Sequence, residues 1–111
     1  LGPRIIMVSD AMAAAGKGDG SYTIGALPVE VKDGVARLAS NQKLAGSTLT
    51  ISQAFTNLIN QCGLTLEQAV HATSIQPAKA FGLKDRGGIA VGMRADLLSY
   101  NSSSGSISVI S

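Results

Sequence analysis

The pattern of apolar and polar positions divides the chain into short segments that predict a mixed α/β fold. Ile5 to Val8 is an uninterrupted apolar run that ends at Ser9 and Asp10. A run this short and rich in Ile and Val is typical of a strand buried on both faces, as in parallel sheets and barrels. Functional groups collect at the C-terminal ends of such strands, so Asp10 is a candidate for chemistry. The structural alternative is a turn residue that caps the strand.

The same strand bears on the extent of the chain. A strand buried on both faces needs neighbours on both sides, and nothing precedes Leu1 to supply them. The sequence also begins without an initiator Met. We therefore expect the chain to be the last part of a larger protein.

Residues 21 to 39 predict β structure with a hairpin turn at Asp33-Gly34, a dipeptide favoured in type I′ turns. The resulting register places apolar pairs on one face and a Glu–Arg pair on the other. The predicted pairs are Lys32–Val35, Val31–Ala36, Glu30–Arg37 and Val29–Leu38.

Helical spacing of apolar residues predicts three helices in the next part of the chain. The first carries Ile51, Ala54, Phe55, Leu58, Ile59 and Cys62, with Ser47 or Thr48 as its cap and Gly63 at its end. The second begins at Thr65, with Gln68 as the partner in a capping box, and runs to about Ala72. The third runs from Pro77 to about Gly82.

The last part of the chain predicts β structure again, from Gly87 to Leu98. A polar, linker-like stretch follows over Asn101 to Ser106, and Ile107 and Val109 are placed for a last strand.

Composition narrows the function classes. The 111 residues are 45% hydrophobic and carry a net charge of +2, with Lys and Arg scattered, which gives little support to nucleic-acid binding. Leu44 to Leu66 has no charge, but its many Ser, Thr, Asn and Gln residues argue against a membrane span. Cys62 is the single cysteine, so no internal disulfide is possible, which favours a reducing compartment such as the cytoplasm.

Other candidate groups have structural explanations. His71, the single imidazole, lies near the end of a predicted helix, where a structural hydrogen bond or a contact with the helix C-terminus accounts for it. Cys62 fits the apolar face of its helix as a core thiol. The loop Gly16 to Gly20 lacks the spacing of a phosphate-binding loop and is taken as a surface loop or a lid. The carboxylates show no metal-ligand spacing.

Several segments together resemble the C-terminal third of the N-acetylglucosamine-6-phosphate deacetylase family, within the amidohydrolase superfamily. The segments that carry the resemblance are Val8 to Met12, Asp19 to Tyr22, Lys43 to Ser47, Ala72 to Ser74 with Pro77-Ala78 and Phe81 to Leu83, and Gly87 to Ala90 with Gly92 and Ala95 to Leu98. The sequence differs from the family at Asn101 to Ser111, a short Ser-rich tail where a longer closing strand is expected.

The resemblance implies an α/β fragment: the last strand and helices of a metal-dependent-hydrolase TIM barrel, with part of a small β-sandwich. On that analogy, Ile5 to Val8 matches the eighth barrel strand. The implied division is residues 1–20 as last barrel strand and active-site loop, 21–39 as the hairpin region, 40–86 as the helical layer, and 87–111 as sandwich strands and tail.

The resemblance also implies the chemistry, which is hydrolysis of N-acetylglucosamine 6-phosphate to glucosamine 6-phosphate and acetate. Asp10 matches the catalytic aspartate, which acts as general base and then general acid. Leu44, Ala45 and Gly46 match a substrate-contacting segment in which main-chain groups bind and Gly46 permits close approach. The implied cofactor is a divalent metal, zinc or iron, and its Glu and His ligands are expected upstream of this chain. The remaining implied partners are the rest of the polypeptide and further copies in a homo-oligomer.

Two other readings stay open on the sequence alone. One is a different metal-dependent amidohydrolase, of dihydroorotase-like or aminoacylase-like type. The other is a structural or interaction module that descends from the same fold. The segments Ser9 to Met12 and Leu44 to Ser47 argue for the sugar-phosphate deacetylases.

Overall fold

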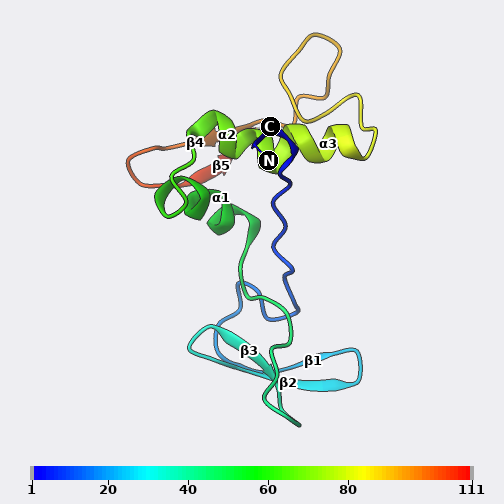
Figure 1. Ribbon diagram of the computed structural model, residues 1–111, viewed down its shortest axis with the longest axis vertical. Coiled ribbons are helices and arrows are strands. Elements are labelled where there is room, and N and C mark those ends of the chain that lie inside the picture. The colour runs from blue at the N-terminus through cyan, green and yellow to red at the C-terminus, as the bar shows by residue number, and fades with distance from the viewer. Residues whose placement is uncertain (1, 111) are drawn as a thin grey trace. The chain divides into compact units, whose positions relative to one another are not determined.

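A computed structural model describes residues 2–110 of the chain (Figure 1). The described residues divide into two compact units, one formed by residues 2–7 with 55–110 and the other by Val8–Ala54. Residue 1, which begins the first predicted segment, and residue 111, which ends the last one, lie outside the described residues. Among residues 2–110, no helix is long and apolar enough to span a membrane.

The unit Val8–Ala54 is built on a three-stranded antiparallel sheet. Its strands β1 (Gly20–Ile24), β2 (Leu27–Lys32) and β3 (Val35–Leu38) lie in chain order. The turn at Asp33-Gly34 has φ of +51° and +76°, the two left-handed residues that a type I′ turn requires. All four predicted pairs between β2 and β3 are confirmed.

One face of this sheet carries the core of the unit. The strand residues buried there are Val29, Val31 and Ala36, and they pack with Ala14 and Ala45 from the flanking loops. Glu30 and Lys32, which alternate with the buried valines, are exposed. The alternation in the sequence therefore corresponds to one packed face and one solvent face.

The prediction of a buried strand at Ile5 to Val8 is wrong for the described residues. A short 3₁₀ turn, η1 (Gly2–Arg4), precedes an irregular segment in which Ile5 is 39% and Val8 is 69% exposed. Its main-chain bonds are those of the Ile5 N–H to the Gly2 carbonyl and the Met7 N–H to the Ala72 carbonyl. A strand depends on hydrogen bonds from neighbouring strands, and no strand of residues 2–110 lies along this segment.

Helix α1 (Ile51–Asn60) forms where the apolar spacing predicts, but its cap is Thr50, not Ser47 or Thr48. The Thr50 hydroxyl accepts the Gln53 N–H at 3.2 Å, whereas the Ser47 hydroxyl accepts the Leu49 N–H and stays outside the helix. Thr48 donates its hydroxyl to a carbonyl of the hairpin turn.

The C-terminal end of α1 confirms one prediction and corrects another. Gly63 has φ of +73°, as expected of a glycine that ends a helix. Cys62 is exposed and not a core thiol, because the helix ends at Asn60 and the apolar face no longer continues through position 62.

The second and third predicted helices form one continuous helical run. The capping box of Thr65 and Gln68 is confirmed and starts α2 (Leu66–Val70), which passes without a break into the π-helix η2 (His71–Ile75) and α3 (Gln76–Ala80). His71 therefore lies inside a helical run and not at a helix end. The predicted break before Pro77 is replaced by the π turn, in which the Gln76 N–H donates to the His71 carbonyl.

Proline also explains how the N-terminal segment is held. Pro77 has no N–H to offer the Ala72 carbonyl, which stands five residues before it in the π register. That carbonyl instead accepts the N–H of Met7 at 2.9 Å. Met7 also packs against the apolar cluster of this unit, which is centred on Phe55, Leu58, Ala69 and Ala72.

The C-terminal segment closes the same cluster. Strands β4 (Leu98–Tyr100) and β5 (Ile107–Val109) pair antiparallel, which confirms the predicted last strand, and Tyr100 meets Phe55 edge to face with ring centroids 5.2 Å apart. The β structure predicted from Gly87 to Leu98 is wrong except at its last residue. Gly87 and Gly92 have φ of +94° and +88°, so the segment folds as a looped excursion closed by a bond from the Arg94 N–H to the Asp85 carbonyl.

Candidate active site

Asp10 occupies an uncommon main-chain conformation at an exposed turn. Its φ is +51°, in the left-handed region that few residues other than Gly, Asn and Asp adopt. The hydroxyl of Ser9 accepts the Ala11 N–H at 3.3 Å across this turn. The prediction that Asp10 follows a buried strand is not met among the described residues, because Ile5 to Val8 is irregular and exposed there.

Main-chain hydrogen bonds join Asp10 to the second predicted site segment. The Ser47 N–H donates to the Asp10 carbonyl at 2.9 Å, and the Met12 N–H donates to the Ser47 carbonyl at 2.8 Å. These bonds make Ala11 and Ser47 an isolated parallel bridge. Asp10 and the segment Leu44 to Gly46 therefore lie side by side within one compact unit.

The segment Leu44 to Gly46 is fixed from the sheet side as well. Ala45 is 8% exposed and donates its N–H to the Ala36 carbonyl at 3.0 Å, while Leu44 lies opposite Arg37 and is 68% exposed. This segment thus lies along the free edge of β3, joined to it by an isolated antiparallel bridge. Its position depends on the register of the hairpin.

Gly46 is required by its surroundings. It has φ of +90°, and a Cβ there would lie 3.2 Å from Met12 Cβ and 3.4 Å from the Asp10 carbonyl oxygen. The missing side chain therefore permits the close approach between this segment and the turn at Asp10. No hydrogen bond from the described residues reaches the N–H or the carbonyl of Gly46.

An open depression of about 530 Å³ adjoins this segment within the same unit. Its lining comes from the hairpin turn, the loop before the sheet and the residues that lead into α1. The lining residues are Gly16, Gly34, Val35, Ala36, Gly46, Ser47, Thr48, Leu49, Thr50 and Gln53. A group bound there would meet apolar side chains such as those of Val35 and Leu49 together with main-chain atoms and the hydroxyl-bearing residues Ser47, Thr48 and Thr50, a mixture that is typical of ligand sites.

Ser47 is a residue of the candidate site that the sequence does not single out for this role. The sequence predicts a helix cap there, whereas the Ser47 main chain makes both hydrogen bonds to the turn at Asp10. The available signal was its place directly after Leu44 to Gly46 in a segment that the resemblance already singled out.

His71 and Cys62 belong to the other unit. His71 is half-buried at the start of η2 and lines a depression of about 380 Å³ together with Gly2, Pro3, Ile5, Leu64, Glu67, Gln68 and Ala72. The predicted contact of His71 with a helix C-terminus is wrong, because His71 lies inside the continuous helical run, and the predicted structural hydrogen bond stays a prediction.

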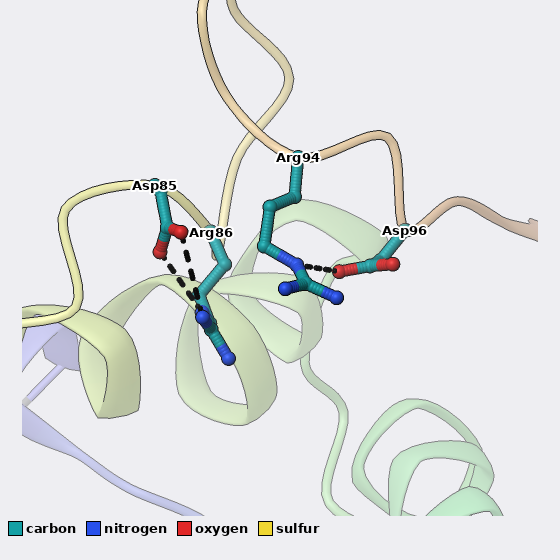
Figure 2. Close-up of polar contacts among 4 residues, drawn as sticks. All are labelled: Asp85, Arg86, Arg94 and Asp96. Carbon is teal, nitrogen blue, oxygen red and sulfur yellow. Dashed lines mark hydrogen bonds and ion pairs between the residues drawn. The ribbon is translucent and has the colours of Figure 1, made fainter.

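Two exposed ion pairs brace the loop before β4. Figure 2 shows Asp85 facing Arg86 and Arg94 facing Asp96, with nitrogen–oxygen distances of 3.0 and 2.6 Å. The hydrogen bond from Arg86 lowers the pKa of Asp85, and the one from Arg94 lowers the pKa of Asp96. The pKa of Arg94 is raised in return by its hydrogen bond with Asp96. All four side chains remain in solvent, so these pairs act on loop conformation.

The donors of the described residues do not form a metal centre. Across residues 2–110, no three His, Cys, Asp or Glu side chains gather closely enough to hold a metal ion. Asp10 alone supplies one carboxylate, whereas structural and catalytic metal sites use three or four protein ligands.

Comparison with known proteins decides the family. The sequence profile described as "Amidohydrolase family" matches residues 46–108. The chain belongs to the amidohydrolase family. Members of this family are generally metal-dependent. Since the donors of residues 2–110 do not fit a metal ion, this amidohydrolase segment lacks a ligand set of its own among the described residues.

Relatives of this amidohydrolase segment are named as deacetylases of amino-sugar phosphates. An N-acetylgalactosamine-6-phosphate deacetylase of Escherichia coli O157:H7 is 39% identical over 100 residues, which are 89% of this chain and 26% of the relative. The crystal structure of N-acetylglucosamine-6-phosphate deacetylase from Thermotoga maritima matches with a TM-score of 0.87 and 40% identity, over 98% of this chain and 30% of that chain.

A second solved structure matches equally well. It is a Mycobacterium smegmatis N-acetyl-D-glucosamine-6-phosphate deacetylase mutant in complex with N-acetyl-D-glucosamine-6-phosphate, with a TM-score of 0.87 and 38% identity over 98% of this chain. Deacetylases of this kind combine a TIM barrel with a β-sandwich, and the residues described here form a small α/β piece. The chain spans 30% of each of these two solved chains.

Proposed function

We propose that the protein containing this chain hydrolyses the acetamide of N-acetylglucosamine 6-phosphate to glucosamine 6-phosphate and acetate. The observation that carries the proposal is the pair of main-chain bonds that hold Asp10 beside Leu44 to Gly46. These bonds keep the Asp10 main chain next to a segment whose Gly46 has main-chain groups without hydrogen bonds from the described residues. The likeness to named sugar-phosphate deacetylases supports the same substrate class.

Asp10 is the group that moves the proton. Its exposed carboxylate accepts a proton from the water that attacks the acetyl carbon, and then gives this proton to the nitrogen as the carbon–nitrogen bond breaks. The second transfer is needed because an amine leaves only as the neutral species. The products are acetate and the free amino sugar phosphate, so one water is consumed and no atom is left over.

Leu44, Ala45 and Gly46 hold the substrate through their main chain. The N–H and carbonyl of Gly46 are free of hydrogen bonds from the described residues, and the glycine leaves room for a sugar to approach. Ala45 anchors the segment to β3, so the free groups are held in a fixed place. A fixed main chain suits the discrimination of hydroxyl positions.

The remaining features of the proposal concern the rest of the protein. A zinc or iron ion would be held by Glu and His residues outside this chain, since the described donors do not fit it. Residues 1–20 and 40–86 would belong to the barrel, 21–39 to a hairpin region of the barrel or the sandwich, and 87–111 to the sandwich strands and tail. The enzyme would be a cytoplasmic homo-oligomer.

The galactosamine epimer is a second candidate substrate. The Escherichia coli O157:H7 relative that carries this name is 39% identical, close to the 40% of the Thermotoga maritima glucosamine enzyme. The two sugars differ in the orientation of one hydroxyl. Acetate release from both sugar phosphates by the full-length protein separates the candidates, and the substrate with the higher kcat/KM is the assigned one.

Substitution of Asp10 tests the mechanism in the full-length protein. Asp10→Asn should retain the fold and lower kcat by about 10²–10⁴-fold, the range for a lost proton-transfer group. Asp96→Asn removes an exposed carboxylate far along the chain and should keep kcat within about twofold, as surface changes usually do. A folded Asp10→Asn enzyme with normal turnover would remove Asp10 from the mechanism.

A further inference from the structure

The turn between β2 and β3 holds a carboxylate from elsewhere in the chain. Asp19 accepts the N–H of Asp33 on Oδ2 at 2.8 Å and the N–H of Gly34 on Oδ1 at 3.1 Å. Successive amides in left-handed conformation make a concave cradle for an anion, and φ is +51° and +76° at these two residues. The carboxylate of Asp19 fills this cradle with two charge-assisted hydrogen bonds.

The sequence at this turn is chemically labile. In an Asp-Gly pair the glycine nitrogen can attack Cγ of the aspartate, and water leaves as a cyclic succinimide forms. Water then adds to either carbonyl of the ring and restores aspartate or gives isoaspartate, so the overall change is an isomerisation without another reactant. Asp33 and Gly34 are both exposed, and Gly34 has no side chain to shield its nitrogen.

We propose that Asp33 is a latent isomerisation site and that the carboxylate of Asp19 suppresses the reaction. The attacking nitrogen must lose its proton and turn toward Cγ, but this N–H is held by Asp19 Oδ1. Loss of the proton would also leave two negative charges about one hydrogen bond apart, which is unfavourable. The second bond, from the Asp33 N–H to Asp19 Oδ2, keeps Asp33 itself in the turn conformation.

Isomerisation would reach the candidate active site through the hairpin. Isoaspartate adds one carbon to the main chain, and the paired residues Lys32 and Val35 then lose their register. The next element affected is β3, whose Ala36 carbonyl accepts the Ala45 N–H. The segment beside Asp10 would therefore lose its anchor. By suppressing isomerisation, Asp19 preserves the hydrogen bond between Ala45 and Ala36, and this does not depend on the identity of the substrate.

Ageing of the protein in oxygen-18 water tests the proposal. The first passage through the succinimide replaces one oxygen of residue 33 by oxygen-18, whether aspartate or isoaspartate results, and peptide mapping by mass spectrometry measures the labelled fraction. Asp19→Ala should accelerate incorporation about 10- to 100-fold, the factor expected when a hydrogen bond to a charged group is lost. Asp19→Asn, which keeps a neutral acceptor, should give a smaller increase.

Loosening of the hairpin is the competing explanation for such an increase. Val31→Ala weakens the buried side of β2 without touching Asp19, and the urea-unfolded protein sets the upper limit of the rate. The comparison is made at equal amide protection of β2. The proposal is supported if Asp19→Ala incorporates label faster than Val31→Ala, and it is overturned if the two are equal or if Asp19→Ala stays at the wild-type rate.

Discussion

Replacement of Gly46 by alanine should release the contact that holds Asp10. The φ of +90° at Gly46 costs a side chain about 1–2 kcal/mol, as for any L-residue in the left-handed region. The new Cβ would also meet Met12 Cβ at 3.2 Å and the Asp10 carbonyl oxygen at 3.4 Å. Overpacking of this kind costs about 1–3 kcal/mol, so the two effects together lower local stability by about 2–5 kcal/mol.

Gly18→Ala is a matched control for the backbone cost. Gly18 has φ of +86°, nearly the value at Gly46, but a Cβ there has nothing within 4 Å. The control therefore carries the left-handed cost of about 1–2 kcal/mol without the steric contacts.

Amide hydrogen exchange at Met12 and Ser47 is the direct assay, because these two N–H groups make the bonds in question. In the full-length protein, Gly46→Ala should speed their exchange by about 5- to 140-fold more than Gly18→Ala does, since overpacking adds about 1–3 kcal/mol and about 1.4 kcal/mol corresponds to a factor of ten. Equal exchange rates in the two variants would show that the contacts around Gly46 have no energetic weight.

Two further predictions concern the loop before β4. Gly87→Ala should destabilise the protein by about 1–3 kcal/mol more than Gly92→Ala in urea unfolding, because a Cβ at Gly87 would lie 2.6 Å from Ala78 Cβ while Gly92 stands in open space at a similar φ. Equal losses would contradict the contact. The pKa of Asp96 is lowered by its hydrogen bond with Arg94, so the stabilisation is present above the unfolded pKa of about 3.9 and is lost as pH falls through the lowered folded value. Asp96→Asn should therefore be less stable than wild type at neutral pH and equal to it in strong acid, and high salt should narrow the gap.

The parts of the fold that sequence reasoning predicted are those fixed by neighbouring residues. The hairpin register follows from the Asp33-Gly34 turn and from the alternation on each side of it, all within a few residues. The capping box at Thr65 is likewise a local pattern, with both bonds formed between residues three apart. Such features need no knowledge of the rest of the chain.

The failures concern distant partners. Ile5 to Val8 has the composition of a strand, but a strand needs hydrogen bonds from other strands, and no local rule says whether these are at hand. Ser47 is a residue type that commonly caps helices, but its main chain forms hydrogen bonds with the turn at Asp10. The helix is therefore capped by Thr50.

The candidate site shows the same division. The position of Asp10 after an apolar run is a sequence signal, and only the resemblance implies that Asp10 and Leu44 to Gly46 belong to one active site. Nothing in the sequence indicates the left-handed φ of Asp10. The hydrogen bonds between Asp19 and the hairpin turn, which lies 14 residues further along the chain, are not indicated by the sequence either. Both depend on how loops far apart in the sequence meet.

The surface of the chain supports a last prediction, that the purified 111-residue chain associates with itself. Large apolar side chains stand in solvent, among them Phe81 at 78%, Ile89 at 90% and Val91 at 107% exposure, while the largest fully buried side chain among residues 2–110 is Val29. Exposed apolar surface that is not covered by the chain itself drives association in water. Sedimentation velocity should therefore show oligomers that dissociate as concentration falls. Ile89→Lys with Val91→Glu should shift the distribution toward monomer if these side chains drive it, because charges at an apolar contact are costly to bury. A wild-type chain that sediments as a single monomer at all concentrations would contradict the argument, since the exposed apolar side chains would then be tolerated without a partner.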